Sequence, residues 1–167
     1  MKKILLLSDT HGYIDESILK FVKESDEVWH AGDIGDKIVH ESISQIKPLL
    51  AVYGNIDDQA CRKTFPETKI IETEGVKTVM LHIAGSFGKY NTETRSKIEA
   101  NQPAVLVCGH SHILKIDYDE KYRLLYINPG AAGKHGFHKI RTMVRFEIDK
   151  SLIKNMEVIE LGSRTKI

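Results

Sequence analysis

Short apolar runs that recur along the chain limit the fold more than any other feature of the sequence. The five that matter are Ile4–Leu7, Val28–Ala31, Leu49–Tyr53, Val79–Leu81 and Ala104–Cys108. Runs this short, separated by polar or helix-like segments, are typical of β-strands in α/β proteins. Between the first two runs, apolar residues follow a helical spacing in the order Ile14, Ile18, Phe21 and Val22. With Asp15 as a candidate cap, this stretch and its two flanking runs predict a β-α-β unit.

The remaining chain is predicted to contain two more helices and several antiparallel strands. The helical segments are Asp57–Lys63 and Thr92–Asn101, and Glu74-Gly75 is the expected turn between strands Lys69–Thr73 and Val76–Ala84. After Cys108, apolar and polar residues alternate, as in antiparallel strands with one face exposed to water. The alternating segments are Ile113–Asp119, Arg123–Asn128, Thr142–Asp149 and Ile153–Leu161. The second half of the chain is therefore expected to be mostly a meander.

The composition is that of a soluble globular domain. The chain has 167 residues, 41% hydrophobic and 28% charged, which suffices for one sizeable core and not for two ordinary domains. We therefore predict a single domain over residues 1–167. No apolar run approaches the roughly 20 residues of a membrane span, and Met1–Leu7 is too short to hold the apolar core of a signal peptide. The sequence predicts no membrane association and a cytoplasmic location.

Charge and cysteine content disfavour other classes of protein. A net charge of +1 makes a nucleic-acid partner an unfavoured prediction. One stretch without acids contains Lys134, His135, His138, Lys139, Arg141 and Arg145. We interpret it as a solvated face or an interface rim, although beside an active site it would attract a phosphate. Cys61 and Cys108 are too few for a disulfide framework, and neither is expected to enter the mechanism.

Residues with ligand-type side chains stand at the ends of all five apolar runs. In chain order they are Asp9 and His11, then Asp33, Asn55 and His82, then His110 and His112. Because the carboxyl ends of strands in α/β sheets converge on one crevice, these side chains are expected to meet there. Taken singly, such residues are typical of loop caps or core histidines. The ordered set predicts one common site.

The ligand types indicate a metal site. A carboxylate such as Asp33 is able to bridge two cations, while imidazole nitrogens and an amide oxygen occupy the remaining positions. Nitrogen and oxygen donors without thiolate suit Mn, Fe, Zn, Ni or Co better than Ca. We expect divalent ions, manganese first, with Fe, Zn, Ni, Co or Mg as alternatives.

At these motifs the sequence resembles the calcineurin-like metallophosphoesterases, and within them the small single-domain phosphodiesterase branch. The matching motifs span nearly the whole chain and are Ser8–Gly12, Gly32-Asp33, Gly54–Asp57, Gly109–His112 and Ile127–Gly130. The resemblance implies an α/β fold, a four-layer α/β/β/α sandwich of two mixed sheets flanked by helices, with two divalent metal ions. It implies one ion held by Asp9, His11, Asp33 and His112, and another held by Asp33, Asn55, His82 and His110.

Two positions depart from the family pattern. The histidine at position 82 is usually followed at once by glycine in relatives, whereas here Ile83 and Ala84 precede Gly85. Many relatives also carry a histidine after the Gly-Asn motif, where it serves as an acid or a phosphate ligand. This chain has Ile56 at that position. The resemblance therefore implies a phosphoesterase that lacks this proton donor.

The implied activity is hydrolysis of a small phosphate-ester substrate by a hydroxide that bridges the two ions, with a diester favoured over a monoester. The predicted catalytic residues are Asp33, Asn55 and His82, and the resemblance implies that Asn55 also orients the phosphate. Lys89 and Arg95 are candidate substrate-binding cations at the pocket edge. Further candidates are His135 and His138, while His30 and His40 are expected to be structural.

Two other functions are compatible with the same fold. A non-catalytic metal-binding interaction scaffold would be expected to have lost ligands, whereas every ligand position is filled in this chain. A nuclease is favoured only by the basic segment near residue 140 and would bind nucleic acid in a salt-sensitive way. The sequence leaves a homo-oligomer open.

Overall fold

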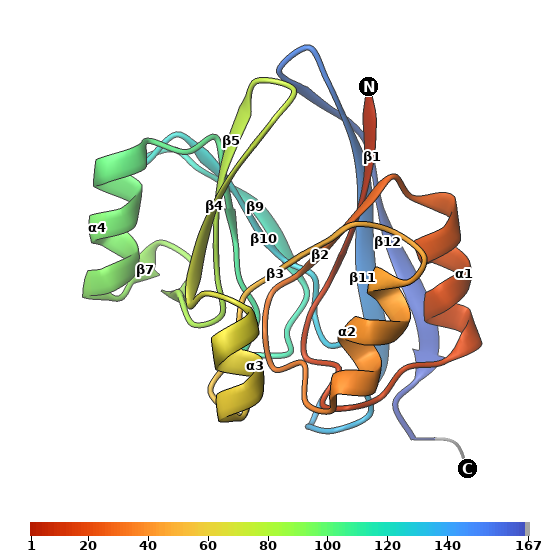
Figure 1. Cartoon of the computed structure of the whole chain (residues 1–167). Helices are drawn as coiled ribbons and strands as arrows, with labels where there is room; N and C mark the ends of the chain where they lie inside the picture. Colours follow the sequence, from red (N-terminus) through yellow and green to blue (C-terminus); the bar gives the residue numbers. More distant parts are fainter. Residues whose placement is uncertain (166–167) are drawn as a thin grey trace.

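The computed structural model describes residues 1–165, which contain two five-stranded sheets and four helices (Figure 1). The first sheet has the order β12 (Leu152–Ser163), β11 (Ile140–Asp149), β1 (Lys2–Leu7), β2 (Glu27–His30) and β3 (Leu49–Ala51). The second has the order β4 (Thr68–Thr73), β5 (Val76–Leu81), β8 (Val105–Val107), β10 (Leu124–Asn128) and β9 (Lys115–Asp119). The other elements are the short strands β6 (Gly85–Ser86) and β7 (Lys89–Tyr90) and the helices α1 (Glu16–Glu24), α2 (Lys37–Ser44), α3 (Gln59–Thr64) and α4 (Thr92–Asn101).

Both sheets mix parallel and antiparallel pairs. Strands β1, β2 and β3 are parallel neighbours, and β11 lies antiparallel to β1. In the second sheet β5, β8 and β10 are parallel, while β4 and β9 form antiparallel edges. The prediction of a meander is therefore wrong. The two late hairpins form, but β9–β10 belongs to the second sheet and β11–β12 to the first, and β10 also pairs in parallel with β8.

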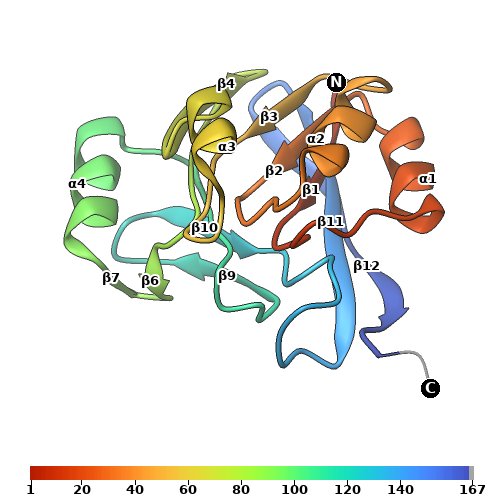
Figure 2. The same ribbon diagram turned by 60° about the horizontal axis from the view of Figure 1, so that its bottom comes forward.

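Three apolar clusters set the order of the layers. The two sheets face each other across a cluster that includes Leu6 and Met80. Because successive side chains of a strand point to opposite faces, Leu5 lies on the other side of the first sheet and packs in a cluster with Ile18 of α1. The outer face of the second sheet packs against Ile98 of α4. Figures 1 and 2 show α1 and α2 beside the first sheet and α4 beside the second, which confirms the predicted four-layer sandwich.

The sequence predicts helix α1 but not helix α2. Helix α1 begins as expected, since the Asp15 side chain accepts a hydrogen bond of 2.9 Å from the Ile18 backbone N–H. Helix α2 is absent from the sequence prediction. It begins after Asp36, and its buried residues are Val39 and Ile43. Val39 and Ile43 lie one turn apart, as Ile18 and Val22 do in α1, so the sequence contains the same helical spacing at this place.

The element ends place the polar motifs in loops. Strand β5 ends at Leu81, before the predicted end at Ala84, so that His82 begins the following loop. The predicted turn at Glu74-Gly75 is confirmed, and both residues have positive φ.

Cys108 is a buried free thiol in the core, as expected. No helix within residues 1–165 is long and apolar enough to cross a membrane.

Candidate metal centre

Side chains with ligand atoms meet at the carboxyl ends of five strands. They are Asp9 and His11 after β1, Asp33 after β2, Asn55 after β3, His82 after β5, and His110 and His112 after β8. Strand β1 runs downwards from the N-terminus in Figure 1, so its carboxyl end lies at the lower edge of the first sheet. Two groups are able to hold a metal ion: Asp9 with His11 and His112, and Asp33 with His82 and His110. Within each group the ligand atoms lie within 4.8 Å of one another.

Asp33 lies between the two groups. Its Oδ2 is 3.4 Å from His11 Nε2 and 3.2 Å from His82 Nε2, while its Oδ1 accepts a hydrogen bond of 3.1 Å from the Ile56 backbone N–H. One carboxylate thus faces histidines of both groups. Asn55 lies beside the second group, with Oδ1 at 3.0 Å from His110 Nδ1. The structure therefore brings together all seven predicted ligands.

Buried atoms without hydrogen-bond partners support metal binding at this place. Within residues 1–165, Asp9 Oδ1, His11 Nε2 and His82 Nε2 are buried and have no hydrogen-bond partner. Leaving such atoms unpaired costs roughly 1–3 kcal/mol each, and two divalent cations, one in each ligand group, would satisfy all three. The His82 Nδ1 lies 2.7 Å from the Ala31 carbonyl oxygen, which fixes the tautomer that leaves Nε2 free to coordinate. The residues present fit two divalent ions.

Unusual backbone conformations hold the ligands in position. Positive φ values occur at Asp9 (55°), His11 (44°), Asp33 (53°), His110 (72°) and His112 (61°). Each such residue costs of order 1–3 kcal/mol, and the cost is tolerated where surrounding contacts fix the loop. Five of the seven predicted ligands therefore have a strained backbone.

The glycines of the motifs permit close approach of the loops. A Cβ at Gly54 would lie 2.1 Å from Asp33 Oδ1, and one at Gly32 would lie 2.6 Å from His82 Nδ1. Either side chain would displace a predicted ligand. The Gly-Asp and Gly-Asn motifs therefore combine a ligand with the space that the neighbouring ligand needs.

Asp57 is a supporting residue to which the sequence analysis assigns no role. Its buried carboxylate accepts hydrogen bonds from the backbone N–H groups of Ile34 (3.2 Å), Gly35 (2.8 Å) and Gly54 (2.7 Å). It thereby ties the loop of Asp33 to the loop of Asn55. The available signal was an acid in the Gly54–Asp57 motif, but such an acid is equally typical of the start of a helix.

Replacing Asp57 by alanine is expected to lower the free energy of unfolding by about 3 kcal/mol, because three backbone donors lose a charged acceptor. Denaturant unfolding of the metal-free protein measures this. The matched control is Asp58→Ala, which removes only the cap of α3, a hydrogen bond of 2.9 Å from Cys61 N–H, and should cost about 1 kcal/mol. Equal destabilisation by the two variants would contradict the assigned role.

The charges of the site favour a cation. Burial raises the pKa of Asp33 and of Asp9, but contacts with the surrounding histidines outweigh burial and hold both pKa values below the ordinary carboxyl range. Burial lowers the pKa of His82, but the neighbouring Asp33 and Asp9 raise it overall. Both carboxylates are therefore ionised near neutral pH, and His82 must give up a proton before it coordinates an ion.

The two histidines predicted to be structural lie outside the ligand set. His30 is fully buried, with Nε2 at 2.9 Å from Thr10 Oγ1 and Nδ1 accepting a hydrogen bond of 3.2 Å from Gly32 N–H. Burial lowers the pKa of His30 to about 4, so the ring is neutral near pH 7. His40 packs edge-on against Phe65, with ring centroids 5.2 Å apart. Both contacts are those of structural side chains.

An open cleft of about 540 Å³ gives access to the ligands. Its lining includes His11, Asp33, Asn55, Ile56, His110, Ser111, His112, Ile113, His135, Phe137 and His138. His135 stacks on His11, with ring centroids 4.7 Å apart, and His138 Nε2 lies 2.9 Å from the Gly133 carbonyl oxygen. The segment around residues 135–138 therefore forms one wall of the cleft, and the candidate histidines of this segment lie beside the ligands.

The predicted substrate-binding cations lie elsewhere. Lys89 is exposed in β7, and Arg95 is exposed on α4 with Nη2 at 3.4 Å from Thr92 Oγ1. Neither is among the residues that line the cleft. Their contact with substrate stays a prediction.

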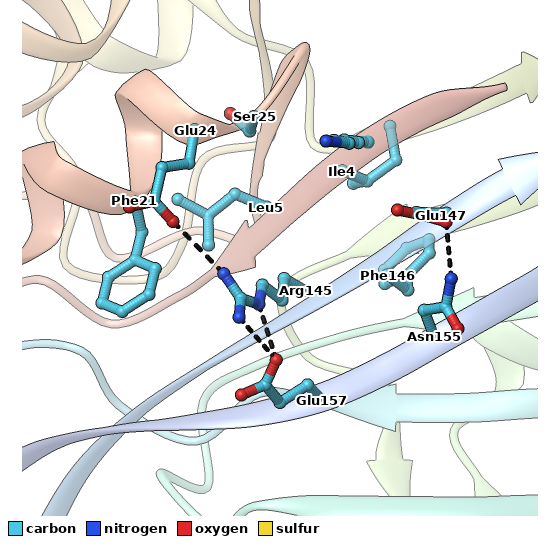
Figure 3. A pocket seen from close by; sticks show the side chains of 11 residues that line it. Ile4, Leu5, Phe21, Glu24, Ser25, Arg145, Phe146, Glu147, Asn155 and Glu157 are labelled. Atoms are coloured by element: carbon cyan, nitrogen blue, oxygen red, sulfur yellow. Dashed lines mark hydrogen bonds and ion pairs between the residues drawn. The ribbon is translucent and has the colours of Figure 1, made fainter.

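The arginines of the basic segment are held by acids from other elements. Arg141 is buried, donates to the Ala132 carbonyl oxygen at 2.7 Å, and lies 3.1 Å from Asp15 Oδ2. Figure 3 shows Arg145 between Glu24 of α1 and Glu157 of β12. Its guanidinium lies 3.3 Å from Glu24 Oε2 and 2.7 Å from Glu157 Oε2, and it lines a hollow of about 460 Å³ that no predicted ligand lines. These arginines therefore join elements of the fold and are not free to attract a phosphate.

Comparison with known proteins finds phosphoesterases among the similar chains. A probable metallophosphoesterase of Mycoplasma pneumoniae is 30% identical over 138 residues, which are 78% of this chain and 79% of that protein. An archaeal phosphodiesterase of known structure has a TM-score of 0.73 at 23% identity and covers 95% of this chain and 99% of its own. Wild-type Vps29 of Entamoeba histolytica, solved in complex with zinc, has a TM-score of 0.72 at 17% identity, with coverage of 95% and 98%. At these identities the two structures show likeness of fold alone.

The family assignment rests on a match over most of the chain. Residues 1–151 match the family model described as the calcineurin-like phosphoesterase superfamily domain. This span includes all seven predicted ligands and both sheets except β12. The chain therefore belongs to the calcineurin-like phosphoesterase superfamily, a family of metal-dependent hydrolases.

Proposed function

We propose that this protein hydrolyses phosphodiesters at a centre of two divalent metal ions. The observation that carries the proposal is the position of Asp33 Oδ2, 3.4 Å from His11 Nε2 and 3.2 Å from His82 Nε2. When bound, two ions would neutralise phosphate charge and lower the pKa of a shared water towards neutrality. Manganese is proposed as the first ion to test.

The residues of the chain would hold and orient the reactants. One ligand set comprises Asp9, His11, Asp33 and His112, and the other comprises Asp33, Asn55, His82 and His110. Ser8 Oγ donates a hydrogen bond of 2.6 Å to Asp9 Oδ2, and such partners fix the orientation of a ligand. Asn55 also lines the cleft, where its side-chain amide would orient the phosphate.

Metal analysis of the purified protein, combined with hydrolysis assays on aryl monoesters and diesters, tests the proposal. We expect two divalent ions per chain and turnover of the aryl diester. If the protein binds two ions but hydrolyses none of the esters, the result would favour the non-catalytic scaffold. Since the similar structures include both a phosphodiesterase and a zinc-bound Vps29, turnover separates the two functions, whereas fold and metal binding do not.

A nuclease has less support than a phosphodiesterase for small substrates. Arg141 and Arg145, the arginines of the basic segment, are bound to acids of the same chain. An extended nucleic-acid surface needs several free cations. A salt-sensitive gel shift with nucleic acid would restore this alternative.

Ile56 is expected to restrict the leaving groups that the protein accepts. The side chain lines the cleft and is 46% exposed, so this position offers substrate an apolar group in place of a proton donor. A poor alkoxide leaving group needs an acid, whereas a phenolate leaves without one. We expect an aryl diester to be hydrolysed at least about 100-fold faster than an alkyl monoester at equal metal loading. Ile56→His should narrow this ratio.

The matched control for this substitution is Ile56→Leu, which keeps an apolar side chain and should preserve the ratio. Steady-state rates for both esters are measured in all three proteins. Equal rates for the two esters in the parent, unchanged by Ile56→His, would show that residue 56 does not set the leaving-group range.

A further inference from the structure

A second hollow lies beside the cleft at the metal centre and shares part of its lining. The cleft described above forms a first lobe, and a second lobe of about 400 Å³ lies between residues 83–87 and residues 109–115. His110, Ser111 and Ile113 line both lobes. Because His110 is a predicted metal ligand, a group bound at the ions has both lobes within reach.

The walls of the two lobes carry apolar side chains that face solvent. Ile56, Ile113 and Phe137 line the first lobe, and Ile83 and Ile113 line the second. All four side chains are exposed to solvent. Phe137 is fully exposed, at 103%. A gathering of exposed apolar side chains beside a polar centre is typical of a ligand-binding site.

The second lobe has an aromatic wall and one cation. Phe87 and Tyr126 line it with ring centroids 5.4 Å apart and planes at 69°. Lys115 Nζ lies 5.1 Å from the centroid of Phe87 and 3.0 Å from Asp117 Oδ2. This ion pair is exposed and therefore weak, so the lysine is able to turn from the ring and from Asp117 towards an anionic group. Lys115 is the one lysine or arginine among the residues that line either lobe.

Ser111 provides a hydrogen-bond donor at the junction of the lobes. Its Oγ accepts hydrogen bonds from Asn128 Nδ2 at 3.0 Å and from Ile113 N–H at 3.2 Å. With both acceptor positions used, the hydroxyl hydrogen is directed elsewhere. An anionic phosphate at the junction is a suitable acceptor for it.

We propose that the second lobe binds a planar aromatic ester group of a phosphodiester, with Phe87 in contact with the ring and Lys115 attracting the anionic ester. The inference rests on the proposed function and extends it to a substrate class. A monoester has one organic group and fills one lobe, whereas a diester fills both. Aromatic rings favour contact with other aromatic rings beyond the effect of buried area, which favours an aryl group over an alkyl group.

Binding of unreactive diester analogues to the manganese-loaded protein tests this inference separately from catalysis. Calorimetry compares diphenylphosphinate with methylphenylphosphinate, which share charge and differ by one ring. Both have P–C bonds in place of the ester bonds, so hydrolysis does not remove them. We expect diphenylphosphinate to bind more tightly to the parent, and Phe87→Leu to raise its Kd about tenfold. Lys115→Ala should raise the Kd of both compounds about threefold at low salt and have little effect at high salt.

Two comparisons keep the test specific. Lys121→Ala is the matched control, because Lys121 Nζ lies 5.1 Å from the ring centroid of Tyr122 in the same type of contact but does not line either lobe. This variant should leave both Kd values unchanged. Unchanged binding of both phosphinates by Phe87→Leu, in a variant with parental stability and metal content, would overturn the proposal. Turnover of an aryl diester is assayed in parallel, so tight ring-dependent binding of the phosphinate without hydrolysis of the diester would contradict the proposed function and leave the subsite supported.

Discussion

Asp33→Asn is expected to abolish binding of both metal ions and to lower kcat/KM for an aryl diester by at least about 10³-fold. Asp33 faces histidines of both ligand groups at 3.4 and 3.2 Å. It lies closer to the second group than Asp9 does, whose Oδ1 is 3.8 Å from His82 Nε2. An amide has nearly the same shape but no charge, so it would weaken both ion sites at once. Elemental analysis and steady-state kinetics measure the two effects.

The matched control for this substitution is Asp36→Asn. Asp36 is a nearby exposed carboxylate whose Oδ1 caps α2 by accepting a hydrogen bond of 2.9 Å from Ile38 N–H. Asparagine caps helices as well as aspartate does, so this variant should keep its stability, both ions and its turnover. An Asp33→Asn protein with two bound ions and normal turnover would refute the role of Asp33 as a ligand shared by both ions.

Activity is expected to disappear on chelation, to return with Mn²⁺, and to fall as the pH is lowered. Asp33 and Asp9 raise the pKa of His82 above its ordinary value in spite of burial. His82 therefore keeps its proton at a higher pH than a free imidazole, and this proton competes with the metal ion. As the pH is lowered, the apparent metal affinity should begin to fall while the pH is still above 6.5, the ordinary pKa of histidine. Asp33 and Asp9, whose pKa values are lowered, stay ionised over this range.

Raising the Mn²⁺ concentration should shift this loss to lower pH, because ions and protons compete for the same nitrogen. Titration of chelated protein with Mn²⁺ at several pH values, followed by activity, measures the shift. Full turnover after verified removal of metal would exclude a metal mechanism. A pH profile independent of Mn²⁺ concentration would exclude proton competition at the ligands.

Much of the fold follows from apolar periodicity, which reports on burial and not on strand partners. The α1 prediction is confirmed because Ile18 and Val22 lie one turn apart above a capping Asp15. The alternation after residue 113 correctly predicts β9–β12 as strands, yet it contains no information about which sheet each hairpin joins. The assignment of β11 to the first sheet depends on its long-range pairing with β1.

The candidate site was predictable where a ligand type stands at the end of a strand. The supporting residues were not, since their roles depend on loops that are distant in sequence. Asp57 looks like a helix-start residue and joins two ligand loops only in the folded chain. Lys89 and Arg95 were candidates by charge alone, whereas Lys115 lines the second lobe because β9 lies next to β10.

The most direct test of the account is a crystal structure of the manganese-loaded protein with anomalous diffraction at the manganese edge. We expect two peaks roughly 3.5–4 Å apart, both in contact with Asp33. One should lie among Asp9, His11 and His112, and the other among Asn55, His82 and His110. A single peak, or two peaks that do not share Asp33, would contradict the proposed centre.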